Sequence, residues 1–311
     1  MEMKKIKLIV LALLSAIVLK NVYAQQEPQY SQYMFNMMSV NPAYAGTREA
    51  LNALVLSRFQ WIGMDGAPRS HTFVLHTPVK DKKIGIGMSV INDYIGPVRN
   101  TYLNLNYAYR ISLNEKLTLS MGLKGGIYNY YVGLTDLNIN ESDVNFNQDF
   151  KKNLQPNLGT GFYLYSDDYY LGISVPKLIK SDLQNEDSDN NVLSEIRRHY
   201  FISAGYMFDI NSDWKFKPSL LNKMVEGAPP SLDVTAQALY KGQVWLGTTY
   251  RIGDAVVFLF EIQVNRQIIV GYSYDVTISE MNNVTNGSHE FLISYDFAGF
   301  TNEKVKSPRY F

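Results

Sequence analysis

The chain has 311 residues, no cysteine, and 29 basic residues balanced by 29 acidic ones. Without cysteine there is no disulfide framework, so a packed core or a closed sheet must stabilise the fold. The balanced charge removes the bulk attraction expected of a nucleic-acid binder, and we expect no nucleic-acid partner. The chain holds 23 Tyr and 15 Phe but no apolar run of membrane-helix length after residue 24, a composition that favours a membrane β-barrel.

Residues 1–24 have the layout of a secretory signal peptide. Lysines at positions 4, 5 and 7 precede an apolar run over 8–19, and small residues close the segment at Ala24. This run is shorter than the roughly 20 residues that a membrane-spanning helix needs. We predict cleavage after Ala24 and a mature chain that starts at Gln25, with an uncleaved anchor helix as the alternative. Because no cysteine follows the cut, a lipid anchor is excluded.

Residues 25–48 differ from the rest of the mature chain. Apolar side chains recur there at the spacing of one helical face: Tyr30, Tyr33, Met34, Met37 and Met38. Asn41 and Pro42 would end such a helix. An exposed stripe of this kind would be sticky in the periplasm, so we expect 25–48 to be a helical plug or periplasmic segment, packed inside or beneath a barrel.

Apolar and polar residues alternate with a period of two over most of the remaining chain. In 101–111, Leu103 and Leu105 share one face, while Asn104 and Asn106 share the other. The stretch 116–124 repeats the pattern, with Leu119 and Met121 opposed by Ser120. The pattern predicts about fourteen strands, give or take about two, in an all-β, antiparallel up-and-down transmembrane barrel over 49–297. Leu103, Leu105, Leu119 and Met121 would face lipid and Asn104, Asn106 and Ser120 the lumen.

The predicted connections separate this barrel from a soluble sandwich, which also alternates. Counted from the first connection, every second one is short. The others are 60–69, 92–99, 131–154, 176–197, 222–230, 251–254 and 275–288, and all of these except 251–254 are long. Outer-membrane barrels place long loops outside and short turns in the periplasm, and a sandwich has no reason to do so. Tyrosines at strand ends would form interfacial girdles, among them Tyr107, Tyr109, Tyr128, Tyr130, Tyr131, Tyr169, Tyr170, Tyr272 and Tyr274.

No constellation of catalytic or cofactor-binding residues emerges. The histidines at 71, 76, 199 and 289 show no metal-ligand spacing, and His76–Thr77 and Ser288–His289 are strand neighbours that point to opposite faces. Gly122, Gly125 and Gly126 lie in a strand without a following helix, so we interpret them as glycines that relieve curvature in a barrel wall. We expect no enzyme, metal or cofactor, and keep a barrel hydrolase as a minor alternative.

Specific blocks of sequence resemble the PorP/SprF family of the type IX secretion and gliding systems of Bacteroidetes. The opening blocks are EPQYSQYMFN at 27–36 and NPAYAG at 41–46, followed by RFQWIGMDGAP at 58–68. The resemblance returns at 287–290 and 294–297 and covers nearly the whole mature chain. Family members commonly finish at the aromatic end of the last strand, whereas here a tail over 298–311 follows Phe297. We expect this tail to make a periplasmic contact.

The resemblance implies an outer-membrane barrel that partners the periplasmic or outer-membrane components of the secretion machinery. It also implies binding and retention of an exported surface protein, such as a gliding adhesin, through that protein's C-terminal sorting domain. An outer-membrane channel for small or hydrophobic solutes is the alternative, since it would show the same alternation. Residues in the family-like blocks are the candidates for partner binding: Tyr30, Tyr33, Phe35, Asn41, Pro42, Tyr44, Phe59, Trp61, Asp65 and Pro68.

Overall fold

The computed structural model describes residues 28–48, 50–79, 82–135, 149–184, 192–226 and 228–297, with backbone alone for 181–196. The predicted signal peptide, its cleavage after Ala24 and the tail over 298–311 lie outside these ranges. Within them, no helix is long and apolar enough to cross a membrane.

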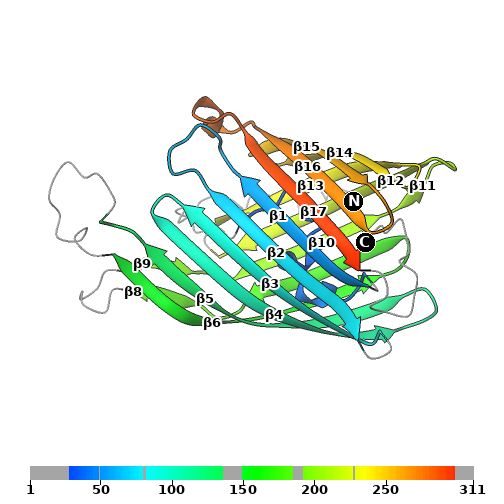
Figure 1. The fold of residues 1–311 in the computed structure, drawn as a ribbon, viewed down its shortest axis with the longest axis horizontal. Helices are drawn as coiled ribbons and strands as arrows, with labels where there is room; N and C mark the ends of the chain where they lie inside the picture. Colours follow the sequence, from blue (N-terminus) through cyan, green and yellow to red (C-terminus); the bar gives the residue numbers. More distant parts are fainter. Residues whose placement is uncertain are drawn as a thin grey trace, which may run out of the picture.

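Fourteen antiparallel strands form one closed barrel (Figure 1). Chain neighbours pair in sequence, β1 pairs with β17, and pairing of β10 with β12 completes the ring. The strands are β1 (Leu51–Phe59), β2 (Arg69–Val79), β3 (Ile84–Ile95), β4 (Val98–Ser112), β5 (Thr118–Val132), β6 (Phe150–Tyr165), β7 (Tyr169–Lys177), β10 (His199–Tyr206), β12 (Trp214–Val225), β13 (Ala228–Tyr240), β14 (Val244–Arg251), β15 (Ala255–Gln263), β16 (Ile268–Thr277) and β17 (Ser288–Phe297). A two-residue strand β11 (Phe208–Asp209) adds to β12, and β8 (Ser181–Gln184) pairs with β9 (Val192–Ile196) in a separate hairpin. The predicted barrel class and strand number are confirmed.

Alternation along the strands separates an apolar outside from a polar inside, as predicted. On β4, Leu105 is 62% exposed whereas Asn106 is 3% exposed. Leu103 likewise faces outward and Asn104 inward. Because the side-chain period of a strand is two, a single register places every second residue of each strand toward lipid.

The long-and-short pattern of connections is only partly right. Long connections do follow β1, β5, β7 and β16, but β3 ends at Ile95 and β4 begins at Val98, so the predicted loop 92–99 is strand apart from a tight turn at Gly96 and Pro97. Likewise β12 continues to Val225 and β13 begins at Ala228, which removes most of the predicted loop 222–230. Both ranges contain residues typical of loops, Gly96 and Pro97 in one and Pro229 and Pro230 in the other, but these residues occupy a tight turn or continue a strand. We call the end with the long connections the loop end, and the opposite one the turn end. The rule for outer-membrane barrels predicts that the loop end faces the exterior.

The predicted aromatic girdle is wrong for three tyrosines. Tyr107 and Tyr109 lie on the outward face and are exposed. Tyr128, Tyr130 and Tyr170 are instead buried on the inward face of β5 and β7. A tyrosine at a strand end therefore joins the girdle only when its position in the alternation points outward.

The described part of the N-terminal segment, residues 28–48, lies within the ring of strands and is called the lumen segment below (Figure 1). The predicted short helical segment is reduced to α2 (Met37–Val40), the one α-helix of this part of the chain, followed by the 3-10 helix η1 (Pro42–Tyr44). Asn41 does end α2, and its side chain accepts a hydrogen bond from the Ala43 backbone N–H at 3.0 Å. Because the barrel surrounds the segment, burial is not confined to one face, and Ser31 and Gln32 are as buried as the tyrosines.

Candidate functional site

Buried carboxylates of the barrel wall hold the start of the lumen segment. Glu290 on β17 accepts hydrogen bonds from the backbone N–H groups of Ser31 at 2.9 Å and Gln32 at 2.7 Å. The Ser31 hydroxyl donates to Asp275 on β16, 2.8 Å from either carboxylate oxygen. The wall thus satisfies two backbone donors of the segment that are buried away from water.

Two arginines neutralise these carboxylates. Arg58 on β1 lies 2.7 Å from Asp275 and 3.3 Å from Glu290. Arg251 on β14 lies 3.3 Å from Asp275 and 3.1 Å from Asp233 on β13. All five side chains are nearly inaccessible to solvent. Buried charges of this kind persist only when paired and hydrogen-bonded, so the network links five strands to the lumen segment.

The second half of the lumen segment bonds to the opposite wall through its backbone carbonyls. The Ser174 hydroxyl donates to the Val40 carbonyl at 2.8 Å, and the Ser120 hydroxyl donates to the Ala43 carbonyl at 2.6 Å. Arg110 donates to the Gly46 carbonyl at 2.6 Å. These donors come from β7, β5 and β4, and the Asn41 amide adds β6 by donating to the Phe162 carbonyl at 2.9 Å. The segment is therefore attached on several sides of the barrel.

Wall glycines make room for this close approach. A Cβ added at Gly122 on β5 would collide with the backbone of Ala43, and one at Gly85 on β3 would collide with the backbone of Ala45. Gly161 and Gly271 face the side chains of Asn41 and Gln32 in the same way. Gly122 thus permits contact with the lumen segment, a role beyond the predicted relief of curvature, whereas a Cβ at Gly125 would meet nothing.

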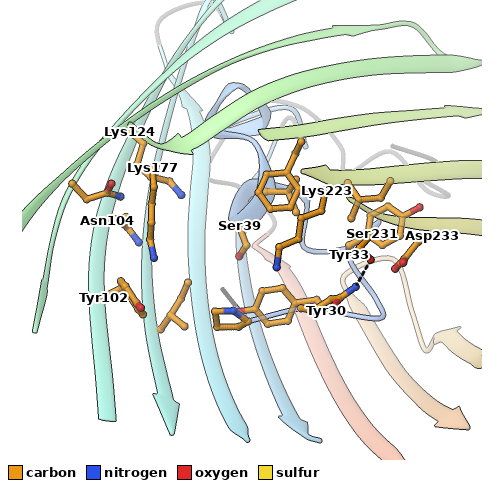
Figure 2. Close-up of a pocket in the computed structure, with 17 residues that line it drawn as sticks. Tyr30, Tyr33, Ser39, Tyr102, Asn104, Lys124, Lys177, Lys223, Ser231 and Asp233 are labelled. Carbon is orange, nitrogen blue, oxygen red and sulfur yellow. Dashed lines mark hydrogen bonds between the residues drawn. The ribbon is translucent and has the colours of Figure 1, made fainter. Parts of the chain in front are cut away.

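A pocket lies beside the lumen segment, between Tyr30 and the wall (Figure 2). Lys124, Lys177 and Lys223 reach it from β5, β7 and β12, and all three are buried. The Lys177 ammonium lies 4.5 Å from the centre of the Tyr102 ring, within the range of a cation–π contact. The interior on this side is thus basic, in contrast to the acidic wall that holds Ser31.

At the loop end, the connection after β1 is joined to the connection before β17. The Ile62 N–H donates to the Gly287 carbonyl at 2.8 Å, and the Asn286 N–H donates to the Ile62 carbonyl at 2.7 Å. The Trp61 N–H donates to the Ser288 hydroxyl at 3.1 Å. Residues 60–68 and 278–287 therefore form one surface, which we call the rim surface. Ile62 is 38% and Val284 57% exposed on it.

The structure separates the ten predicted partner-binding residues into two groups. One group lies on the lumen segment and is buried: Tyr30, Tyr33, Phe35, Asn41, Pro42 and Tyr44. The other group lies at or near the rim surface, where it is exposed or half-buried: Phe59, Trp61, Asp65 and Pro68. The two groups do not form one surface.

Sequence reasoning missed the buried charge network. Arg58 and Glu290 stand in the family-like blocks, and each occupies a position that the alternation directs inward. Charged residues at inward positions of neighbouring strands were the available signal, but alternation alone does not reveal which of them share a salt bridge.

The four histidines lie in different environments. His76 accepts a hydrogen bond from the Gly46 N–H at 3.0 Å, and His289 bonds to the Tyr272 hydroxyl at 2.8 Å. His71 bonds to the Ser57 hydroxyl and His199 to the Arg197 carbonyl. In the described ranges, no group of three or more His, Cys, Asp or Glu residues is arranged to hold a metal ion.

The family described as type IX secretion system membrane protein PorP/SprF matches residues 22–295 of this sequence. The chain belongs to the PorP/SprF family. As a PorP/SprF protein it is a secretion-associated outer-membrane barrel, which confirms the resemblance drawn from its sequence blocks. No curated protein matches it in sequence.

Solved structures with a similar fold are themselves membrane barrels. Omp33 of Acinetobacter baumannii is 9% identical, with 81% of this chain and 100% of that chain covered and a TM-score of 0.47. A FadL homologue of Pseudomonas aeruginosa is 13% identical, with 87% and 95% covered and a TM-score of 0.44. The monoaromatic hydrocarbon channel CymD is 11% identical, with 88% and 95% covered and a TM-score of 0.49.

Proposed function

We propose that this PorP/SprF protein is a closed platform that retains an exported surface protein at the outer face of the membrane. The exported protein carries a type IX C-terminal sorting domain and binds the rim surface, while the turn end contacts the secretion apparatus. The observation that carries this proposal is the lumen segment, which lies inside the barrel and bonds to wall strands on several sides.

The position of this segment inside the barrel argues against the alternative of a solute channel. For a solute to pass, the segment would have to leave the Arg58 network and the hydroxyl groups of Ser120 and Ser174 together. Each buried polar group left without its partner costs about 1–3 kcal/mol, so displacement is expensive in sum. A fixed segment instead supports the wall beneath the rim surface.

The rim surface has the features of a binding site for protein. Its two connections are joined by backbone hydrogen bonds, so little ordering is needed when a partner binds. Trp61 is half-buried there, and aromatic residues held in place in this way commonly dominate protein interfaces. Exposed Ile62 and Val284 add apolar area beside it.

Substitution of Trp61 tests the platform role in cells. Trp61 has a φ of 51°, and asparagine tolerates this left-handed conformation, so Trp61→Asn removes the indole with little backbone strain. We expect the exported protein to appear in the medium rather than on the cell surface, as measured by mass spectrometry of both fractions. Ile252→Asn, in another connection of the loop end, is the matched control and should retain the exported protein. Full retention by Trp61→Asn would refute the rim surface as the binding site.

A further inference from the structure

Charge on the outward face of the barrel is confined to one sector. On the described barrel strands, lysine, arginine, aspartate or glutamate faces outward at three positions only: Arg69 on β2, Arg99 on β4 and Lys151 on β6. All three are exposed, and all lie at the loop end of their strands. The remaining outward face is apolar, aromatic or uncharged polar.

The three cations belong to one row across neighbouring strands. Register pairs Phe59 with Arg69, Arg69 with Tyr94, Tyr94 with Arg99, Arg99 with Tyr131, and Tyr131 with Lys151. Aromatic and cationic side chains therefore alternate along the ring (β1 to β6 in Figure 1). The Arg99 guanidinium lies 5.7 Å from the centre of the Tyr131 ring, and the Tyr131 hydroxyl donates to Asp149 at 2.6 Å. Asp149, just before β6, thus adds a carboxylate next to the row.

The next row toward the membrane centre is polar in the same sector. It consists of Ser57, His71, Asn92, Thr101 and Asn129. On the neighbouring strands the same hydrogen-bonded row continues as Phe291, Tyr272 and Phe260. Only one row deeper does the sector become apolar, with Val55, Phe73, Val90 and Leu103. In this sector the outward face is thus polar for one row more along the strands than on the adjacent β15–β17 face.

A groove of about 470 Å³ opens in this sector. Arg69, His71, Tyr94 and Arg99 line it, together with the backbone of Gly66 and Gly96. The Gly96 N–H donates to the Gly66 carbonyl at 2.8 Å, and the His71 ring bonds to the Ser57 hydroxyl at 3.0 Å. The floor and walls of the groove are therefore held in place, and two guanidinium groups stand on either side of Tyr94.

We propose that this groove binds the phosphorylated headgroup of an outer-leaflet glycolipid, whose acyl chains lie on the apolar rows below. Guanidinium groups bind phosphate through paired charge-assisted hydrogen bonds, and basic pockets at the membrane boundary recognise anionic headgroups in this way. The groove opens toward lipid at the level where the outward face changes from apolar to polar, the depth at which a headgroup lies. The site is separate from the rim surface and extends the protein's contacts to its membrane.

Binding of lipid A, a phosphorylated glucosamine disaccharide with acyl chains, tests the proposal. The full purified chain in detergent is titrated with lipid A and with its dephosphorylated form, and bound lipid is counted by native mass spectrometry. We expect the phosphorylated form to bind about tenfold more tightly or better, because two guanidinium groups contact phosphate. Equal binding of the two forms would overturn the proposal, and this comparison requires no variant.

A matched pair of triple variants assigns the binding to the row. Arg69→Gln, Arg99→Gln and Lys151→Gln together should lose the preference for the phosphorylated lipid. Lys83→Gln, Lys116→Gln and Arg266→Gln remove the same charge from exposed positions in turn-end connections and should keep it. Unchanged preference in the row variant would contradict the site. The proposal would also be contradicted if the row variant kept its lipid binding but no longer bound an acidic protein partner. The groove would then be a site of protein contact.

Discussion

At the scale of single residues, the barrel interior depends on a few buried charges in mutual contact. Arg58 bonds to Asp275, Glu290 and the Ser31 hydroxyl, so one side chain joins β1, β16, β17 and the lumen segment. A buried ion pair adds little net stability compared with an apolar pair of the same shape, but loss of one partner leaves an uncompensated charge. The residues of this network are therefore the sensitive points of the interior.

Arg58→Met should destabilise the protein by about 3–5 kcal/mol, because Asp275 and Glu290 lose their shared cation while they remain buried. Arg266→Met, in an exposed connection of the turn end, should change the free energy of unfolding by about 0.5 kcal/mol or less. Urea unfolding in detergent micelles, followed by tryptophan fluorescence, measures both. Equal midpoints for the two variants would mean that the network is not a stabilising contact.

Gly122 and Gly125 provide a second residue-scale comparison within one strand. Gly122→Val places a side chain against the Ala43 backbone and should cost about 1–3 kcal/mol through overpacking. Gly125→Val enters open space on the outward face, where a branched apolar residue suits a lipid-facing strand, and should be neutral or stabilising. The same urea titration distinguishes them, and an equal cost at both positions would contradict the close approach of Ala43.

At the scale of elements, alternation along each strand determines which side chains face lipid and which face the barrel interior. The lumen segment does not follow this rule. The segment consists of turns, a four-residue helix and a 3-10 turn, because its backbone groups bond to the wall. Strands, in contrast, satisfy their backbone in the barrel and need only an apolar outward face.

The register predicts different costs for one substitution at two exposed leucines. Leu105→Arg places charge on the lipid face within β4 and should destabilise the barrel by about 2–4 kcal/mol near the bilayer centre. Leu113→Arg lies in the turn-end connection after β4, where the cost should be about 0–1 kcal/mol. Folding yield into vesicles, assayed by heat-modifiable migration in gels, reports the difference. Similar yields would show that the assigned register is wrong.

Much of the architecture was predictable from the sequence, because successive residues of a barrel strand face lipid and the barrel interior in turn. Leu105 and Asn106 suffice to orient β4, and equivalent pairs orient the other strands. The turn at Gly96 and Pro97 was not predictable, because the polar residues that flank it look like loop in sequence but continue the ladder at headgroup level. The extent of the helix in the lumen segment was also not predictable. Apolar residues at helical spacing predict a helix when one face is buried, whereas this segment is buried on every face.

The candidate site was predictable in part. The family-like block over 58–68 contains the half-buried Trp61 of the rim surface, as well as Arg58 of the interior network. Arg58 pairs with Asp275 and Glu290, which lie more than 200 positions away in the chain. Alternation predicts that each side chain faces inward, but it does not predict which side chains are in contact. The aromatic and cationic row likewise appears only when the strand register is known.

At the scale of the whole molecule, a barrel of fourteen strands encloses more space than its own inward side chains fill, and the lumen segment occupies that space. The barrel thus holds its own N-terminal region inside, which we propose closes it, and has a joined pair of loops at one end. This arrangement fits a protein that holds partners at the membrane surface rather than one that passes solutes.

Conductance in planar bilayers is the most direct test of closure by the lumen segment. The full mature chain should insert without conductance steps, whereas a chain that lacks residues 28–48 should form a steady pore. The deletion variant should still insert, because Arg58, Asp275 and Glu290 would then face water and need no buried partner; heat-modifiable migration in gels checks this. Conductance of the full chain equal to that of the deletion variant would contradict the closed platform and favour a solute channel.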